Sequence, residues 1–168
     1  MSSLQYVSRL ANPFRPLMHL ACVGLLSTLC LTPPCHATTA TDEAIPTPDV
    51  LAQLELRASQ ANPREQVFLY TQLVHTMTRK AGREIAEGDN EEAAATLNKV
   101  SQYAHIIHVS LARDAKKLKD AEELMHNTTY RLAQVLHLVS GPDKVTVQAT
   151  LKQLDQVNDE ILAQVFTH

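Results

Sequence analysis

The sequence predicts an all-α protein made of antiparallel helical hairpins that share one long central helix. Three observations lead to this prediction. Apolar residues recur at helical spacing through most of the chain after residue 48. Residues 90–139 contain no glycine and no proline, so nothing in their composition ends a helix. Helix-ending and helix-starting residues, namely Gly88, Gly141 and Pro142, lie at the borders of the apolar-periodic segments.

The first 37 residues have the three parts of a secretory signal peptide. Arg9 and Arg15 supply a positive start, residues 20–31 are apolar, and Cys35, His36 and Ala37 form a cleavage site with small residues at the −3 and −1 positions. The apolar run is shorter than the about 20 residues that span a bilayer, and no second run follows. We therefore expect a cleaved signal over residues 1–37 and no stable transmembrane anchor, with uncleaved anchoring as the alternative.

The composition after residue 37 narrows the class of protein. Cleavage removes all three cysteines, so the remaining chain must be stable without disulfides, which is unlike the small secreted domains of animals and favours a bacterial envelope. All 18 acidic residues lie after residue 37, whereas two of the 15 basic residues precede it. This acidic excess argues against nucleic acid as a partner, because phosphate binding requires clustered positive charge.

The mature chain begins with a polar, flexible segment over residues 38–48, followed by a single helical domain over residues 49–168. The apolar spacing predicts a short helix over residues 49–60. Asn62 as N-cap, Pro63 at the first helical position and Glu65 three residues after the cap predict a second helix over residues 63–87. Gly88 is expected to end that helix.

The third and fourth helices are expected over residues 91–139 and 143–166, with Asn90 as N-cap of the third and Gly141 in the turn between them. Residues 86–93 resemble the turn of tetratricopeptide-type repeats, a resemblance that implies hairpin geometry only. The third helix keeps apolar residues at seven-residue steps, so a continuous helix would be a coiled-coil-like rod or elongated bundle about 74 Å long. The heptad row consists of Leu97, Ala104, Leu111, Leu118, Met125, Leu132 and Val139, and its companion row of Val100, Ile107, Asp114, Ala121, Thr128 and Val135.

The hairpin model gives a structural role to the one charged residue in these rows. Short loops make neighbouring helices antiparallel, so the flanking helices fold back along the central one and meet near its middle. Asp114 would then face Arg64 at the start of the second helix. The alternative is a break in the third helix near residues 113–117, which would give a compact four-helix bundle, although no turn-forming residue lies there.

The residues that could carry chemistry are few. His105 and His108 lie one turn apart and are the candidate ligands of a surface metal site. A haem site between helices is the other cofactor alternative, but covalent haem attachment is excluded because the mature chain has no cysteine. No nucleophile elbow or phosphate loop is present, and the adjacent glutamate pairs diverge on a helix, so we expect no enzymatic activity and no cofactor.

The sequence therefore predicts an exported, non-enzymatic protein, periplasmic or secreted, that acts through apolar helix faces as a structural or protein-interaction module. The partner would be a second copy, giving a homodimer, or another envelope protein. Residues expected at this interface are apolar positions beside the heptad row, namely Ile106, Val109, Leu124 and Leu138. The alternative function is a metal- or haem-binding periplasmic bundle with His105 and His108 as ligands.

Overall fold

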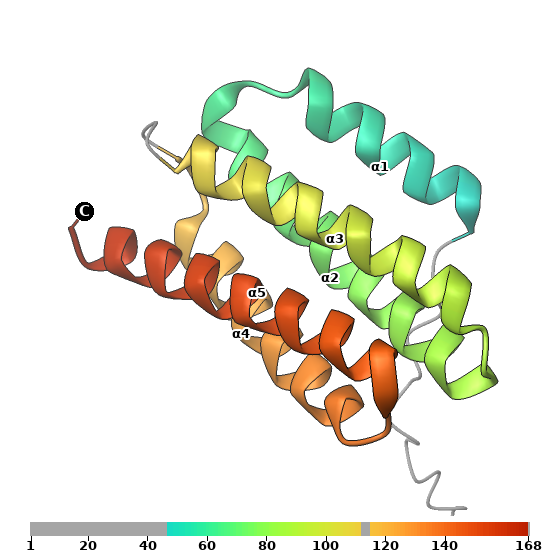
Figure 1. Cartoon of the computed structure of the whole chain (residues 1–168). Helices are drawn as coiled ribbons and strands as arrows, with labels where there is room; N and C mark the ends of the chain where they lie inside the picture. Colours follow the sequence, from blue (N-terminus) through green and yellow to red (C-terminus); the bar gives the residue numbers. More distant parts are fainter. Residues whose placement is uncertain (1–46, 112–114, 168) are drawn as a thin grey trace, which may run out of the picture. The chain divides into compact units, whose positions relative to one another are not determined.

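The computed structural model describes residues 47–111 and 115–167, and within these ranges it is all-helical (Figure 1). The helices are α1 Pro48–Gln60, α2 Pro63–Glu87, α3 Asn90–Ser110, α4 Leu118–Leu136 and α5 Gly141–Thr167. The all-α prediction is confirmed, and the borders of the first two helices agree with the sequence to within one residue. The predicted signal peptide and residues 38–46 of the predicted flexible segment lie outside the described ranges.

Helices α2 to α5 pack as a helical bundle. Helix α2 contacts both α3 and α4, and α5 also contacts both α3 and α4, so each of these helices has two neighbours within the bundle. In Figure 1, α3 and α5 lie in front of α2 and α4. Helix α1 lies outside this group of four, and its backbone comes close to α2 but not to the other helices. None of the helices in the described ranges is long and apolar enough to cross a bilayer.

The predicted long central helix is wrong, because α3 ends at Ser110 and α4 begins at Leu118. The chain turns back with Lys117 in the left-handed conformation, at φ 57°. The start of α2 holds this turn: the Lys116 N–H donates to the Arg64 carbonyl at 2.6 Å, and the Lys117 ammonium lies 4.7 Å from the centre of the Phe68 ring. The compact bundle, which was the alternative, describes the structure, and the break was hard to foresee because a lysine occupies a conformation usually taken by glycine.

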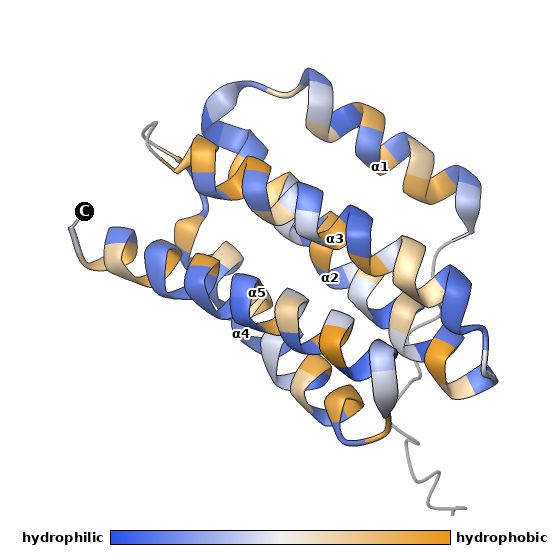
Figure 2. Cartoon of the chain, in the orientation of Figure 1, coloured by the Kyte–Doolittle hydropathy of each residue, from blue (hydrophilic) through white to orange (hydrophobic). Residues whose placement is uncertain are grey.

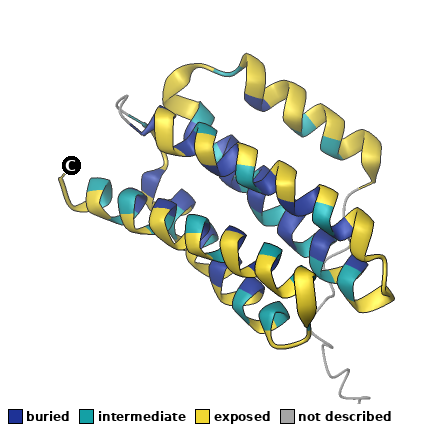
Figure 3. Ribbon diagram, viewed as in Figure 1, coloured by how far each residue is buried: buried dark blue, intermediate teal, exposed yellow. Residues whose placement is uncertain are grey.

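The heptad row nevertheless identifies the core on both sides of the break. Its members are buried from Leu97 through Leu132, and Val139 is half-buried (Figure 3). In the companion row Asp114 lies outside the described ranges, Val135 is half-buried and the other four residues are buried. Figure 2 shows the alternation of hydrophobic and hydrophilic positions along each helix that produces this pattern. The seven-residue spacing therefore predicts which residues are buried without fixing whether the helix is continuous.

The turns at the helix ends mostly follow the predicted capping. Asn62 Oδ1 accepts the Arg64 N–H at 3.0 Å, and Gly88 ends α2 at φ 88°, a left-handed conformation that favours glycine. Gly141 begins α5 at φ 61°, slightly earlier than expected. Asn90 is the first residue of α3 rather than its N-cap, a position that Asp89 takes. The predicted pairing of Arg64 with Asp114 cannot be described, since Asp114 lies outside the described ranges.

Candidate functional site

A groove separates α1 from α3 above α2. Helix α1 packs on α2, and no part of its backbone comes close to α3, so the side chains of α2 form the floor between two helical walls (Figure 1). The groove has a volume of about 420 Å³, within the range of binding pockets in proteins. Its lining residues are Pro48, Leu51, Ala52 and Glu55 of α1, Leu73, Met77 and Lys80 of α2, and Glu92, Ala95, Thr96, Lys99 and Tyr103 of α3.

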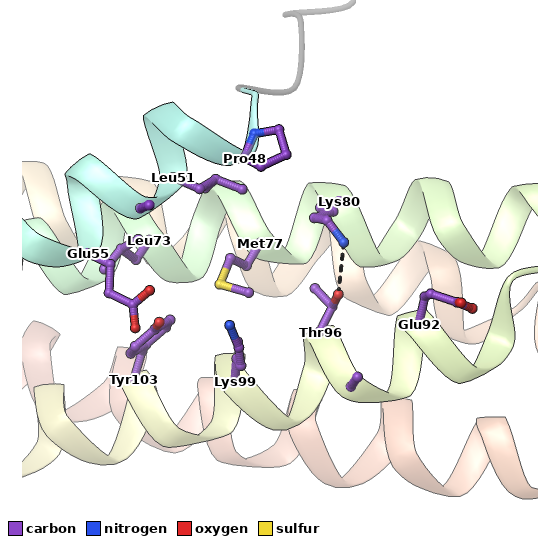
Figure 4. Close-up of a pocket in the computed structure, with 12 residues that line it drawn as sticks. Pro48, Leu51, Glu55, Leu73, Met77, Lys80, Glu92, Thr96, Lys99 and Tyr103 are labelled. Atoms are coloured by element: carbon purple, nitrogen blue, oxygen red, sulfur yellow. Dashed lines mark hydrogen bonds between the residues drawn. The ribbon is translucent and has the colours of Figure 1, made fainter.

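The floor of the groove is apolar, and its walls carry small side chains. Leu73 and Met77 project from α2 into the space between the walls, and both are buried (Figure 4). Ala52 of α1 and Ala95 of α3 are exposed residues on opposite walls. Neither alanine reaches across the gap, so the groove is open above the floor, although Leu73 and Met77 themselves are only 1% and 7% exposed.

Two polar contacts brace the walls of the groove. Glu55 of α1 interacts with the Tyr103 hydroxyl of α3, and the pKa of Tyr103 is raised by burial first and by Glu55 second. Lys80 of α2 pairs with Glu84 and donates to Thr96 Oγ1 of α3 at 3.2 Å (Figure 4). These side chains hold the helices in place, and their polar groups interact with each other.

Two charged groups on the α3 wall have no such partner. Neither the Glu92 carboxylate nor the Lys99 ammonium forms an ion pair or hydrogen bond with any other residue that the structure describes. They lie seven residues apart on one helix, so about 10.5 Å of helix rise separates them on nearly the same face. In Figure 4 the Lys99 ammonium points toward Met77. The groove therefore offers an apolar floor beside one negative and one positive charge at heptad spacing.

The predicted metal ligands lie on α3 away from this floor. The His105 and His108 rings are stacked with centroids 6.3 Å apart. His108 Nδ1 lies 2.6 Å from Glu160 Oε2 of α5, and Gln156 Nε2 donates to the other carboxylate oxygen at 3.0 Å. Burial raises the pKa of Glu160, but these two hydrogen bonds outweigh burial and leave the pKa below its usual value.

His108 therefore joins α3 to α5 through a carboxylate. Within the described ranges no group of three or more histidine, cysteine, aspartate or glutamate residues is placed to hold a metal ion. The metal- or haem-binding alternative stays a prediction, and its two proposed ligands have a structural contact instead of a third ligand. The sequence could not reveal that contact, because 52 residues separate His108 from Glu160.

The structure does not bring the four predicted interface residues together. Ile106 is half-buried against the core, and Leu124 is also half-buried. Val109 is 53% exposed and Leu138 is 74% exposed, but one lies near the end of α3 and the other beyond the end of α4. Since α4 alone is about 28 Å long, these two side chains do not share one patch. Their role in binding stays a prediction.

The groove residues themselves were not predicted as a site. The sequence places Leu51 and Leu54 on the apolar face of α1, and both are half-buried against the core. The sequence does not reveal that the backbone of α1 approaches only one other helix, α2. A usable signal was present in the exposed apolar residues of α1, Val50 and Leu56, since a short helix with apolar residues on several faces has more than one surface to cover.

Comparison with models of protein families, with curated protein sequences and with solved structures finds no significant match to this chain. The functional argument therefore depends on the geometry of the groove.

Proposed function

We propose that this protein is an exported, non-enzymatic interaction module of the bacterial envelope, and that its groove binds an amphipathic helix of another envelope protein. One observation carries the proposal: the backbone of α1 approaches α2 but not α3, which leaves a groove with an apolar floor between α1 and α3. Helical grooves of this kind bind partner helices by burying apolar residues at positions i, i+3, i+4 and i+7.

The charges beside the floor favour a helix over other ligands. Lys99 and Glu92 have opposite signs, so a simple anion or cation would meet repulsion at one of them. A helix lying along α3 can present an acidic residue to Lys99 and, seven residues away, a basic residue to Glu92. Its apolar face would then lie over Met77 and Leu73.

The other polar groups of the groove support a binding role over a catalytic one. Glu55 interacts with Tyr103, and Lys80 is held by Glu84 and Thr96. A general acid or base needs a group free to exchange a proton with a substrate, and these groups are engaged in holding helices together. Export is supported by the signal-like residues 1–37.

A synthetic helix provides a direct test. The probe is a fluorescein-labelled amphipathic peptide of about 14 residues, with leucine at heptad positions and one glutamate seven residues from one lysine. We expect saturable binding, measured by fluorescence anisotropy. Ala95→Phe fills the groove from an exposed position and should weaken binding more than tenfold, whereas Ala149→Phe, at an exposed alanine of α5, should leave it unchanged.

A charge exchange tests the orientation of the peptide. Lys99→Glu should weaken binding by about two- to fivefold, the range expected for an exposed ion pair. A second peptide with the glutamate replaced by lysine should restore binding to this variant. Lys152→Glu on α5 changes the charge equally and serves as the control. Absence of binding by both peptides, or equal binding by Ala95→Phe and the parent protein, would overturn the proposal.

A further inference from the structure

A second groove lies between α2 and α4, and the charged residues among its described lining are basic. It has a volume of about 400 Å³ and lies in the C-terminal halves of both helices. Its described lining residues are Thr78, Arg79, Gly82 and Arg83 of α2, Arg131, Gln134 and Val135 of α4, and Leu138 beyond α4. Three guanidinium groups with no aspartate or glutamate among these residues make a local positive site on a chain with a net charge of −3.

The arginines project from both sides of a close contact between helices. Gly82 of α2 faces Val135 of α4: a Cβ on Gly82 would lie 3.4 Å from Val135 Cγ2, an ordinary van der Waals distance. Arg79 and Arg83 lie one turn apart on α2, which places them on one face, and Arg131 lies on α4. The contact therefore forms a floor with guanidinium groups on two walls.

Of the three arginines that line this groove, Arg131 has the fewest interactions with other described residues. It is exposed and forms no ion pair or hydrogen bond with another residue in the ranges that the structure describes. Arg79 and Arg83 each interact with another group of the chain, so they are partly engaged already. A ligand would add to those interactions, because each guanidinium carries five N–H donors.

A buried hydroxyl lies on the wall of the groove. Thr78 is 3% exposed, and its Oγ1 has no hydrogen-bond partner among the residues that the structure describes. By contrast, the buried Thr71 and Thr150 donate to the carbonyl four residues earlier. An unsatisfied buried hydroxyl is destabilising, and a ligand oxygen that reached it would remove that cost.

We propose that this groove binds a phosphate monoester. Guanidinium groups bind phosphate oxygens in pairs, and three of them around one pocket match a dianion better than a carboxylate with a single charge. Val135 and the exposed side chain of Leu138 give the groove an apolar end for the carbon part of the ligand. The volume exceeds what phosphate alone would fill, which favours an ester over the free ion.

The same chemistry has two sources, a free phosphorylated molecule and the headgroup of an anionic phospholipid. The site is separate from the α1–α3 groove, so it does not depend on the function proposed above.

Phenyl phosphate, which combines a monoester with an apolar ring, serves as the soluble probe in isothermal titration calorimetry. Vesicles of phosphatidylcholine with and without phosphatidic acid, itself a lipid monoester, serve as the membrane probe in co-sedimentation.

We expect Arg131→Gln to weaken probe binding by roughly 10- to 100-fold, the effect of losing a charged hydrogen-bonding partner. Arg131→Lys keeps the charge but loses paired hydrogen bonding and should give an intermediate loss. Arg57→Gln, which removes an exposed arginine on α1, should bind as the parent does. Circular dichroism of each variant confirms that the fold is kept.

The outcomes separate the two sources and can overturn the proposal. Arg131-dependent binding of phenyl phosphate without vesicle binding supports a free phosphorylated ligand, and Arg131-dependent vesicle binding supports a lipid headgroup. Binding that is equal in Arg131→Gln, or absent for both probes, overturns the proposal. Binding that appears only after Asp42→Asn and Glu43→Gln, two substitutions in the segment before α1, also overturns it, because a carboxylate of the chain itself would then be the occupant.

Discussion

The turn between α3 and α4 depends on a lysine in a left-handed backbone conformation. At such a position glycine should stabilise the protein relative to alanine, the reverse of its usual effect in a helix. Lys117 has φ 57° and ψ 34°, just before the first residue of α4. At an ordinary exposed helix position, glycine is about 1 kcal/mol less stable than alanine. We expect the opposite order at Lys117: the Lys117→Gly variant should be more stable than Lys117→Ala.

The magnitude follows from two opposing effects. A left-handed conformation costs a residue with a Cβ about 1–2 kcal/mol, and glycine avoids that cost. Glycine in turn loses about 0.5–1 kcal/mol more conformational entropy on folding. The difference leaves glycine ahead by roughly 0.5–1 kcal/mol in the free energy of unfolding. Both variants lose the contact between Lys117 and Phe68, so that contact cancels in the comparison.

Urea unfolding followed by circular dichroism measures the difference, provided that the slope with denaturant is the same in both variants. Lys152, which is exposed within α5, is the matched control, where glycine should be less stable than alanine by about 1 kcal/mol. A continuous helix through residues 110–118 would make position 117 behave like position 152. If Lys117→Gly is the less stable of its pair, the reasoning about this turn is refuted.

Three further predictions concern other contacts. The folded-state pKa of Glu160 is lowered, so its contribution is present above the ordinary carboxyl pKa and lost as the pH falls through the folded value. Glu160→Gln should therefore lower the free energy of unfolding at pH 7, measured with urea, by at most about 1 kcal/mol, because the contact with His108 is partly exposed. The difference between this variant and the parent should vanish in acid. Glu55→Gln should move the ionisation of Tyr103 to lower pH in an ultraviolet absorbance titration, since Glu55 helps raise that pKa, and an unchanged titration would contradict the contact. Leu132→Ala, at a fully buried position of α4, should cost about 2–5 kcal/mol in urea unfolding, and a loss below 1 kcal/mol would argue against the core as described.

Local sequence signals predicted the helices and the buried residues well, because those features depend on neighbouring residues. Asn62 and Pro63 define the start of α2 through a cap and a fixed backbone angle, and Gly88 defines its end. The heptad row was equally informative, since residues seven apart share a helix face whatever the helix packs against. Its register continues across the turn, from Leu111 to Leu118.

The break in the predicted central helix depends on contacts between distant residues. Residues 111–117 contain neither glycine nor proline, and the turn is held instead by Lys116 and Lys117 on the first turns of α2. The break also gives each helix of the α2–α5 bundle two neighbours within it, and a rod two helices thick could not bury as much apolar surface. Tertiary packing here overrides a strong local helical pattern.

The candidate site could not be derived from the sequence for the same reason. The first groove exists because the backbone of α1 approaches α2 without approaching α3, and the second lies where Gly82 of α2 faces Val135 of α4. The sequence pointed to His105 and His108 as metal ligands, because two histidines one helical turn apart are easily recognised. It had no means of relating Lys99 to Met77, or Arg131 to Arg79, across separate helices.

The most direct test of the proposed function uses the methyl groups of methionine. Residues 38–168 contain two methionines: Met77 on the groove floor, 7% exposed, and Met125, fully buried in the core. With ¹³C-labelled methionine methyl groups, adding the amphipathic peptide should shift the Met77 signal and leave Met125 in place, and Ala95→Phe should abolish the shift. An unchanged Met77 signal at saturating peptide, or equal shifts of both methyl groups, would contradict binding in this groove.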